Sequence, residues 1–583
     1  MVYNKPYYTI LMKNILKFGL IVTVILFSTI ACNDETDGPQ PIDTFSAISG
    51  TDTYSAPVNT SVTVTVNVRA KGLTALSANG NAISFTDDLE QTVSYDFAIP
   101  QNATVGQEFT VKFIASTTDQ TDEFDVTVKA AGQTSEVPVF LQLASEFSDV
   151  KITNLLTSQD VLNASPDFVY GSMADGAGLL ANADGSFTLI NNIEADFSVA
   201  RILLDENLKP FSGEYILNSV ATGGTAQCSG SLISMEEHGF GPVYLSGGEW
   251  TQTPDTYSPG VYRLDPFGSI ANASTPDRIT SMGEWVTENA VAIGQNAYSD
   301  KTVVFIGDDN SDNSVPQGQL GMYVGNKGDL NGGKLYGLKV TSEGIDWEVD
   351  MVEGTEYNAE FVELTERDLV PLNTECLDKG VMGFSRLEDI DWRRGSAANE
   401  REIYFAVTGR ERESLAGRGT FAGRIYRVVL NENDPTGAAK ITCILDGDKV
   451  GGIAEGFHSP DNILVTENYA YIQEDPNGNT GKTGFAKLYQ YNLNTGELKT
   501  VLECDQTAAA SAGFGPDNSI WELTGMIDVS DVTGRDNTFI LITQNHGWEP
   551  ADGSAFTDPT AVSDVANSRK EGSMLFLVEG LGR

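Results

Sequence analysis

Histidine and basic residues are scarce in this sequence. Its 583 residues contain three histidines, and 36 Lys and Arg stand against 81 Asp and Glu, which gives a net charge of −45. Binding to nucleic acid or to anionic lipid needs a basic surface, so this charge excludes both as expected partners. Three histidines cannot form a His-rich zinc site, and they limit a Ser–His–Asp arrangement to His238, His458 and His546.

Long hydrophobic runs are also absent, since the longest apolar stretch covers only residues 18–31. This stretch is too short to span a bilayer comfortably, but it has the length of a signal-peptide core. Its ending, Ala31-Cys32, resembles a relaxed bacterial lipobox. We therefore expect a lipoprotein-type signal peptide over residues 1–31, a lipid on Cys32 and a polar tether over residues 32–43. Ordinary cleavage beside an incidental cysteine is the alternative.

Only four cysteines follow Cys32, and they are Cys228, Cys376, Cys443 and Cys504. The leader predicts an exported bacterial lipoprotein in the outer membrane, in the periplasm or at the cell surface. Its lipid anchor would be its sole contact with a membrane. In an oxidising compartment the four thiols are able to pair, but three pairings are possible and the sequence does not select one.

Alternating valine and polar residues dominate the segment 44–131. The stretch Ser61–Ala70, SVTVTVNVRA, alternates almost perfectly, and two later stretches repeat the pattern. Such alternation is typical of half-buried antiparallel strands. We predict a small immunoglobulin-like β-sandwich here, followed by a linker over residues 132–144. The segment carries no pattern of a chemical site, so a spacer or docking role is expected.

Six related segments occupy residues 145–583. Each consists of a short apolar strand that ends in a polar cluster and is followed by a second strand, as in PVYLSGGEW from Pro242 and FILITQNHG from Phe539. Repeated antiparallel strand sets with few helical stretches predict a β-propeller with six blades. The expected fold class is thus all-β, with a sandwich or a solenoid as the alternative.

Polar residues stand at equivalent places in these repeats. In an antiparallel hairpin the start of the first strand lies beside the end of the second, so polar strand ends should pair. The expected groups are Cys228 with Glu249, Glu388 with Arg410, Asp461 with Glu474, Glu522 with Gln544 and His546, and in addition Glu194, Asp308 and Asp309. If the inner strands line one channel, these groups meet at one mouth of it.

The chemistry of this set favours metal binding. Carboxylates crowded together need positive charge among them, and their oxygens suit Ca²⁺. The thiolate of Cys228 prefers iron, zinc or copper, so a site holding both kinds of ligand needs more than one kind of metal. Arg410 beside metal ions would make a planar, bidentate clamp for phosphate. Metals with such a clamp point to phosphoryl transfer.

Several motifs resemble those of the PhoX-type alkaline phosphatases, over roughly residues 150–583. They are CSGS from Cys228 with LSGGEW from Leu245, RLEDIDW from Arg386, SPDNILV from Ser459 with YIQED from Tyr471, and ELTG from Glu522 with ITQNHG from Ile542. The resemblance implies a six-bladed propeller with a mixed Ca²⁺ and Fe³⁺ cluster. It also implies hydrolysis of phosphate monoesters outside the cytoplasm.

Combining the resemblance with the strand pairing gives a set of predicted site residues. The predicted metal ligands are Glu194, Cys228, Glu249, Glu388, Asp461, Glu474 and Glu522. The predicted catalytic residues are Arg410, Glu388 and His546, and the predicted substrate contacts are Arg410, Gln544 and Asn462. The expected partner is a phosphorylated small molecule, and we expect a monomer.

The sequence also departs from the family pattern. Gly248 stands where a first Glu of a pair is often found, Ser231 replaces a Gly, and an insertion over residues 233–240 follows Cys228. A lipoprotein signal stands where the family usually has a twin-arginine signal. Two other functions therefore stay open: another calcium-dependent propeller hydrolase, lactonase-like or phytase-like, and a non-enzymatic binding propeller stabilised by calcium.

Overall fold

The computed structural model describes residues 45–310, 314–476, 484–517, 521–562 and 570–583. The predicted signal peptide, Cys32 and the tether lie outside these residues. Strands make up 45% of the structure and helices 10%, which confirms the all-β fold class. In the described part of the chain no helix has the length and apolar character needed to cross a membrane.

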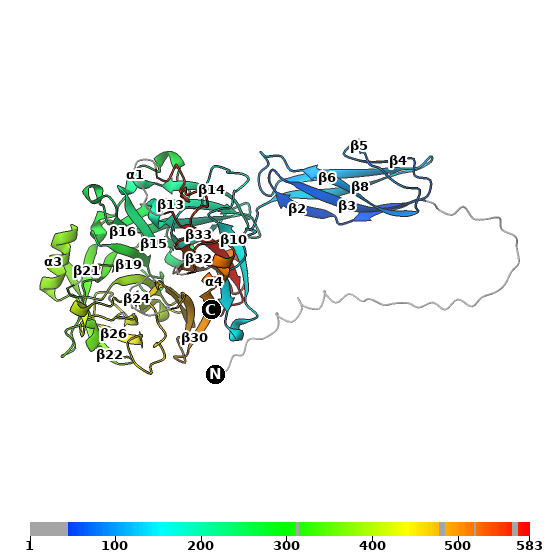
Figure 1. Cartoon of the computed structure of the whole chain (residues 1–583). Coiled ribbons are helices and arrows are strands. Elements are labelled where there is room, and N and C mark those ends of the chain that lie inside the picture. Colours follow the sequence, from blue (N-terminus) through cyan, green and yellow to red (C-terminus); the bar gives the residue numbers. More distant parts are fainter. Residues whose placement is uncertain (1–44, 311–313, 477–483, 518–520, 563–569) are drawn as a thin grey trace, which may run out of the picture.

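The N-terminal part consists of two sheets around one apolar core. It projects to one side of the larger body (Figure 1). One sheet contains β1 (Phe45–Gly50), β3 (Ser61–Ala70) and β6 (Glu90–Ala98), and the other contains β2 (Thr53–Pro57), β8 (Thr121–Ala131), β7 (Glu108–Ser116), β4 (Ala75–Ala78) and β5 (Asn81–Ala82). Along β3 the side chains of Val64, Val66 and Val68 are buried, because alternate residues of a strand face the same side.

The larger body contains six consecutive sets of antiparallel strands. The first set contains β11 (Ala174–Ala181), β12 (Phe187–Ile193), β13 (Ser198–Leu204) and β14 (Pro210–Leu217). The second contains β15 (Thr225–Ile233), β16 (Val243–Thr251) and β17 (Gly260–Leu264). The third contains β18 (Thr287–Ala292), β19 (Lys301–Asp308), β20 (Leu320–Asn326) and β21 (Lys334–Val340).

The last three sets follow the same plan. They are β23 (Leu387–Trp392), β24 (Glu402–Val407), β25 (Arg424–Val429) and β26 (Ala439–Asp446); β27 (Pro460–Val465), β28 (Tyr469–Glu474), β29 (Lys487–Asn492) and β30 (Leu498–Cys504); and β31 (Glu522–Asp528), β32 (Thr538–Asn545) and β33 (Gly572–Glu579). Strand β22 (Glu356–Leu364) pairs with both β21 and β26, so the third and fourth sets form one nine-stranded sheet.

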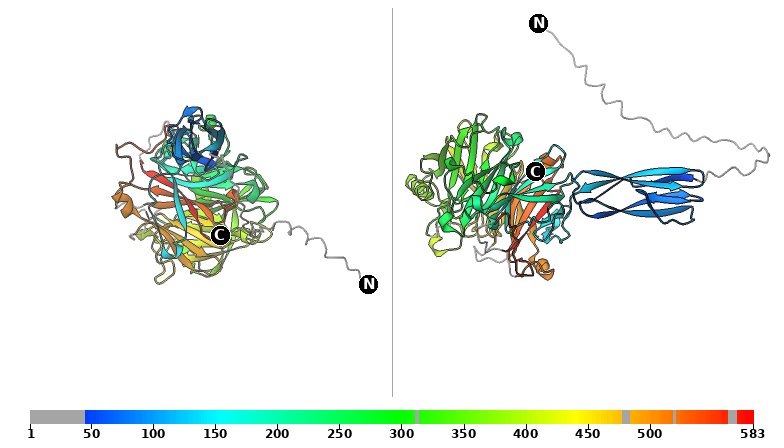
Figure 2. Two further views of the ribbon diagram at one scale, coloured as in Figure 1. Left: turned by 90° about the vertical axis from the view of Figure 1, so that its right-hand side faces the viewer. Right: turned by 90° about the horizontal axis from the view of Figure 1, so that it is seen from above.

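The first strands of the six sets form a closed ring. Strand β11 contacts β15, and the contacts continue through β18, β23, β27 and β31 back to β11. The right-hand view of Figure 2 shows this body with the N-terminal sheets beside it. The six first strands therefore surround a central channel.

Two strands from the start of this body complete the last two sets. Strand β9 (Leu141–Leu143) pairs with β30 of the fifth set, and β10 (Lys151–Thr157) pairs with β33 of the sixth. Strand β9 lies in the segment 132–144, predicted as a linker, so this segment also contributes to a sheet.

Helices are short and lie in the connections between strands. They are α1 (Ser219–Thr222), α2 (Met235–His238), α3 (Leu369–Lys379), α4 (Gln506–Ser511) and α5 (Ser530–Thr533). Apolar clusters fill the spaces between neighbouring sheets, as with Phe384, Phe405 and Tyr426, whose rings contact one another. The four described cysteines are buried and form no disulfide with one another.

Candidate metal centre

A register shift occurs near the start of each first strand. The shifts lie between Ala174/Ala177, Gln227/Gly230, Thr287/Ala290, Leu387/Ile390, Pro460/Ile463 and Leu523/Met526. Such bulges bend a strand and redirect its side chains. The first five shifts contain Asp175, Cys228, Glu288, Glu388 and Asp461, and Glu522 immediately precedes the sixth. On every first strand a side chain able to ligate a metal thus lies at or beside the same irregularity.

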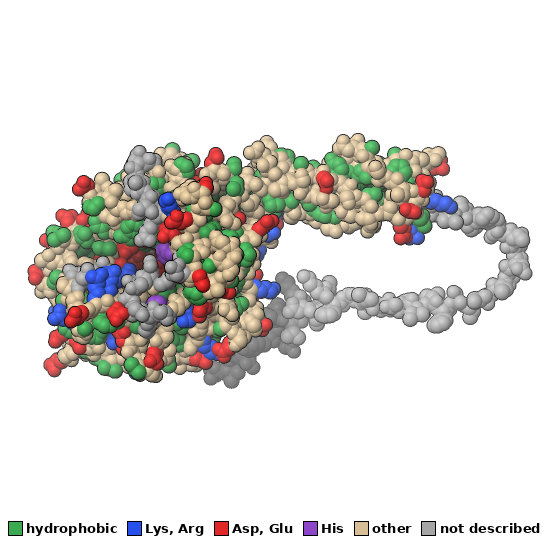
Figure 3. Space-filling model, viewed as in Figure 1, with side chains coloured by type: hydrophobic (Ala, Val, Ile, Leu, Met, Phe, Trp, Pro, Cys, Tyr) green, Lys and Arg blue, Asp and Glu red, His purple; other side chains and the backbone are tan. Residues whose placement is uncertain are grey.

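These side chains line one cavity of about 210 Å³. Seven of the predicted residues meet there, namely Glu194, Cys228, Glu249, Glu388, Asp461, Glu522 and His546. The cavity is also lined by Met173, Asp175, Trp250, Glu288, Arg386 and Asp475. On the face of the molecule shown in Figure 3, acidic side chains lie in a hollow beside a cluster of basic side chains.

Two groups within the cavity bring three possible ligand atoms within 4.8 Å of one another: Glu194 with Cys228 and Glu249, and Asp475 with Glu522 and His546. The Cys228 Sγ–H donates to Glu249 Oε2 at 2.6 Å, which places thiol and carboxylate side by side as the hairpin pairing predicts. In the second group, His546 Nε2 lies 3.4 Å from Glu522 Oε2.

Glu474 is the one predicted ligand that does not line this cavity. Its Oε1 accepts from the backbone N–H of His458 at 2.6 Å, and its Oε2 accepts from that of Lys487 at 3.0 Å. Burial raises its pKa to about 8. The next residue, Asp475, lines the cavity instead, because neighbouring residues of an extended chain face opposite sides.

The arginine that lines the cavity is Arg386, not Arg410. Its Nε and Nη2 donate to both oxygens of Asp309 at 3.1 and 3.0 Å, and Nη2 lies 2.7 Å from Glu388 Oε1. The backbone of Arg386 has a φ of 65°, in the left-handed region. Burial lowers the pKa of Arg410, and the positive charge of the nearby Arg386 lowers it further. Arg410, the arginine that the hairpin pairing predicts beside Glu388, does not line the cavity.

Gln544 and Asn462 lie behind the ring of carboxylates. The Gln544 Nε2 donates to Glu194 Oε2 at 2.7 Å, and the Asn462 Nδ2 donates to Asp175 Oδ1 at 3.2 Å. Both amides are buried and do not line the cavity. They are placed to orient carboxylates, as groups surrounding metal ligands commonly do.

Asp175 and Glu288 escaped the sequence analysis, although both have a recognisable signal. The motifs CSGS, RLEDIDW, SPDNILV and ELTG give four of the first strands a polar stretch, and ADGAG from Ala174 and TENAV from Thr287 are the two remaining examples. Arg386 and Asp475 lie inside the quoted motifs RLEDIDW and YIQED, two residues before Glu388 and one residue after Glu474.

The insertion after Cys228 leaves the metal centre intact. Residues 233–240 contain α2, and Met235 to His238 line a different cavity at the opposite end of the channel. The contact between Cys228 and Glu249 is made without them.

Burial dominates the electrostatics of the cavity. Burial and then neighbouring carboxylates raise the pKa values of Asp175, Glu249 and Glu288. Burial likewise raises the pKa of the Cys228 thiol. Eight carboxyl groups and one thiol line the cavity, and Arg386 and His546 are the basic side chains that line it in the described part of the chain.

Metal ions fit this donor set. Buried carboxylates are stable in the ionised form only when positive charge lies among them, and one arginine cannot balance eight. Carboxylate oxygens are the ligands that Ca²⁺ prefers, whereas the thiol of Cys228 adds a donor for a softer or redox-active ion such as iron. The residues present therefore suit a centre with more than one ion.

Residues 261–547 match the protein family described as alkaline phosphatase PhoX. No curated protein matches the sequence. Strand β15, which carries Cys228, and all residues before it lie N-terminal to the matched residues.

Solved structures resemble the chain only distantly. A quinonprotein alcohol dehydrogenase-like protein from Bacteroides thetaiotaomicron is 12% identical, with a TM-score of 0.28, over 78% of this chain and 95% of that one. A Hadza microbial sialidase is 8% identical, with a TM-score of 0.35, over 84% of this chain and 76% of that one. The β-propeller domain of the Trilobed protease from Pyrococcus furiosus is 9% identical, with a TM-score of 0.25, over 86% and 90%. The resemblance to the PhoX-type alkaline phosphatases that the motifs predict is confirmed by the family match over residues 261–547.

Proposed function

We propose that this chain is a metal-dependent phosphatase that hydrolyses phosphate monoesters outside the cytoplasm. The observation that carries the proposal is the cavity in which ligands from six neighbouring strands meet beside Arg386. The family match supports phosphatase chemistry. The signal-peptide pattern of the sequence supports export and a lipid anchor at Cys32.

The proposed architecture is a six-bladed β-propeller preceded by an immunoglobulin-like sandwich. The closed ring of six first strands supports six blades, each blade being one antiparallel set. The two N-terminal sheets around a shared core support the sandwich. No ligand of the proposed centre comes from the N-terminal part.

The proposed metal ligands are the cavity carboxylates and Cys228. Ca²⁺ suits the carboxylates, and Fe³⁺ suits the group of Glu194, Cys228 and Glu249. When bound, such ions neutralise phosphate oxygens and activate water as a nucleophile. Glu474 is not proposed as a ligand, because its oxygens already accept from backbone N–H groups.

Arg386 is proposed to bind the phosphoryl oxygens of the substrate. Its guanidinium is planar, carries several N–H donors and lines the cavity, which suits bidentate recognition of phosphate. Asp309 holds it from behind through two hydrogen bonds. His546 is proposed to hold the proton that the leaving oxygen takes when the ester P–O bond breaks.

The test compares Arg386→Lys with Arg410→Lys in the calcium- and iron-loaded protein, with an aryl phosphate as substrate. Lysine keeps the charge but loses the planar fork, so Arg386→Lys should lower kcat/KM by roughly 10³-fold. Arg410→Lys should change it little, because Arg410 does not line the cavity. Both variants should keep their calcium and iron by elemental analysis.

Other outcomes would point to the remaining functions. Wild-type protein that hydrolyses no aryl phosphate with both metals present would exclude the phosphatase. Full activity in Cys228→Ala would indicate a calcium-only hydrolase. A larger loss in Arg410→Lys than in Arg386→Lys would move the phosphate clamp to Arg410.

A further inference from the structure

Three arginines follow one another closely in the connection between β24 and β25. They are Arg410, Arg412 and Arg418, in a chain whose acidic residues outnumber its basic residues by 81 to 36. The same connection also carries Glu411 and Glu413. Whether the arginines act together therefore depends on where the fold places them.

Backbone hydrogen bonds hold this connection beside the metal centre. The N–H of Thr408 donates to the carbonyl of Arg386 at 3.0 Å, and the N–H of Gly409 donates to that of Ser385 at 2.9 Å. Arg386 lines the cavity of the metal centre, and Arg410 is the next residue of the connection after Gly409. The half-buried Arg410 thus lies at the rim of this cavity.

Positive charges meet at this rim. Burial lowers the pKa of Arg410, and the charges of Arg386 and Arg412 lower it further. The carboxylates that act on Arg410 in the opposite sense are Asp309 and Glu388, and both already form ion pairs with Arg386. Arg412 is exposed, and no described residue forms an ion pair with it. Figure 3 shows basic side chains gathered beside the acidic hollow.

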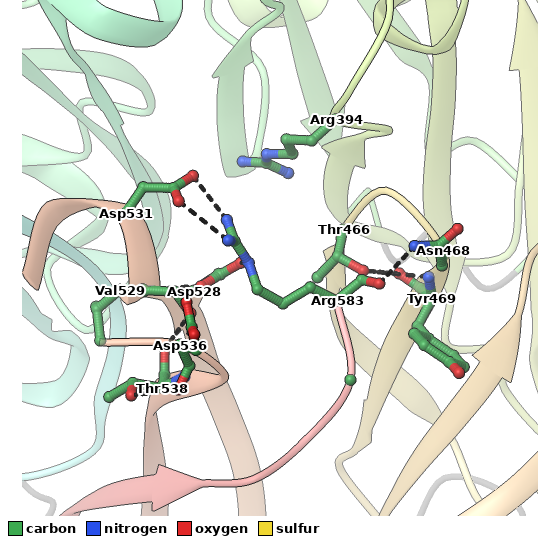
Figure 4. A network of polar contacts seen from close by, with 12 residues as sticks. Arg394, Thr466, Asn468, Tyr469, Asp528, Val529, Asp531, Asp536, Thr538 and Arg583 are labelled. Atoms are coloured by element: carbon green, nitrogen blue, oxygen red, sulfur yellow. Dashed lines mark hydrogen bonds and ion pairs between the residues drawn. The ribbon is translucent and has the colours of Figure 1, made fainter. Parts of the chain in front are cut away.

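Arginines at the other end of the channel are arranged differently. Figure 4 shows Arg583 against Asp531, whose two oxygens it contacts at 2.7 and 3.0 Å, and Arg583 also contacts Asp528. Arg394, in the same view, forms an ion pair with Asp391. These two guanidinium groups each have a carboxylate of their own, so their charges are balanced within the protein.

Neighbouring guanidinium groups suit the binding of anions. Each group is planar and offers several N–H donors, which match the oxygens of phosphate and carboxylate. An anion bound by both Arg410 and Arg412 would also offset the repulsion between their charges. The metal centre occupies a cavity of only about 210 Å³, so the organic part of a bound phosphate ester must extend to the rim where these arginines lie.

We propose that Arg410 and Arg412 bind a second anionic group of the substrate, a phosphate or a carboxylate on its organic part. Phosphate monoesters that carry such a group are then preferred over those that carry none. This inference rests on the proposed phosphatase function, because Arg386 and the metal centre bind the first phosphate. The two arginines also offer local attraction to a polyanion that the net charge of −45 repels from a distance.

Matched pairs of compounds test the proposal in the full chain loaded with calcium and iron. Fructose 1,6-bisphosphate and fructose 6-phosphate differ by a phosphate, whereas 3-phosphoglycerate and glycerol 3-phosphate differ by a carboxylate. We expect kcat/KM to be roughly tenfold or more higher for the compound with the second anion, since hydrogen bonds to charged groups contribute that much. A preference in one pair alone identifies the second anion as phosphate or as carboxylate.

Substitution of the two arginines should remove the preference. Arg412→Ala should reduce it chiefly by raising KM for the compound with the second anion, because the subsite binds substrate and takes no part in bond cleavage. In the double variant Arg410→Ala with Arg412→Ala, the two members of each pair should react almost equally well. Arg418→Ala is the matched control and should keep the preference, since the exposed Arg418 lies over the ring of Trp347, 5.2 Å from its centre.

The proposal is overturned if the wild type hydrolyses both members of each pair equally well, or if the double variant keeps the preference. A wild type that hydrolyses none of the four compounds contradicts the proposed function instead. Titration calorimetry of the same metal-loaded proteins with the two fructose phosphates and with the second pair then decides the subsite. Tighter binding of the compound with the second anion, lost in the double variant, supports it, and equal binding contradicts it.

Discussion

At the scale of single residues, the arrangement around Arg386 explains how one guanidinium is held among many carboxylates. Asp309 accepts hydrogen bonds from Nε and Nη2 of Arg386, and the Glu388 carboxylate forms an ion pair with the same Nη2. Asp309 is almost fully buried, so its charge is little screened by solvent. In the proposed function Asp309 positions Arg386 and does not itself touch the substrate.

Asp309→Asn should therefore impair substrate binding without loss of metal. Asparagine keeps one acceptor oxygen but loses the charge and the second acceptor, so the guanidinium is free to shift. We expect kcat/KM to fall by about 10²-fold, as small misplacements of binding groups do, and inhibition by inorganic phosphate to weaken. Steady-state kinetics and elemental analysis on one preparation measure both.

The neighbouring residue provides the control for this substitution. Asp308 Oδ1 accepts from the backbone N–H of Val286 at 3.0 Å, and asparagine can keep that bond. Asp308→Asn should thus leave phosphate inhibition unchanged. If the two variants behave alike, Asp309 has no special role in holding Arg386.

At the scale of strands, the sequence predicts much of the architecture. Alternating or fully apolar runs with polar ends locate the strands, and antiparallel pairing places Cys228 beside Glu249 and Glu522 opposite Gln544. The positions of the bulges cannot be predicted from this pattern. Each bulge shifts the register by one residue, and this shift decides which of two neighbouring side chains faces the channel. Such a one-residue difference separates the predicted Glu474 from Asp475, which lines the cavity.

Strand β11 was difficult to recognise because it is built from small residues. Its sequence ADGAGLLA lacks the β-branched and aromatic residues that mark a strand. Close packing explains the composition, since a Cβ at Gly176 would lie 2.2 Å from the backbone nitrogen of Gly230 on β15. Because β11 packs closely against β15, it lacks the β-branched and aromatic residues that would identify it as a strand, and Asp175 is not recognised as part of one.

The buried carboxyl group of Glu348, which lies outside the metal centre, connects the segment before β23 with the segment before β25. Glu348 Oε1 accepts from the backbone N–H groups of Ser385, directly before Arg386, and of Thr420. Burial raises its pKa from 4.5 to about 7. Between these two values the unfolded chain has lost the proton that the folded chain still holds, so stability falls as pH rises through this range.

Glu348→Gln should remove this part of the pH dependence. Glutamine keeps the acceptor oxygen and carries no charge, so the variant should match wild type below about pH 4.5 and exceed its stability above pH 7 by on the order of 3 kcal/mol. Urea unfolding of the metal-loaded wild type and variant at pH 5 and pH 8 measures the difference. A variant that is less stable than wild type at pH 8 would show that the charge is favourable where it lies.

At the scale of the whole molecule, the metal centre connects all six strand sets. Every first strand contributes a ligand-type residue, so bound ions would hold the ring together at its middle. The N-terminal sheets have their own core and meet the larger body through few contacts, among them Lys129 with Glu206 and the Gly132 N–H with Asp205. The two parts should respond differently to loss of metal.

Removal of metal by a chelator should lower the melting temperature of the larger body only. At free ion about a thousandfold above Kd, binding adds ~4 kcal/mol to the stability of the folded state. Differential scanning calorimetry should resolve two transitions, of which only the larger moves with EDTA. A chelator that shifts both transitions, or neither, would contradict this assignment of the ligands.

The pairing of β9 with β30 and of β10 with β33 sets the order in which the molecule can be assembled. A growing polypeptide emerges N-terminus first, so β9 and β10 wait for partners that arrive only near the end of synthesis. Until then both keep exposed edges, and the ring stays open. A ribosome-bound or prematurely ended chain therefore lacks a finished cavity, which ties the capture of metal ions to the completed protein.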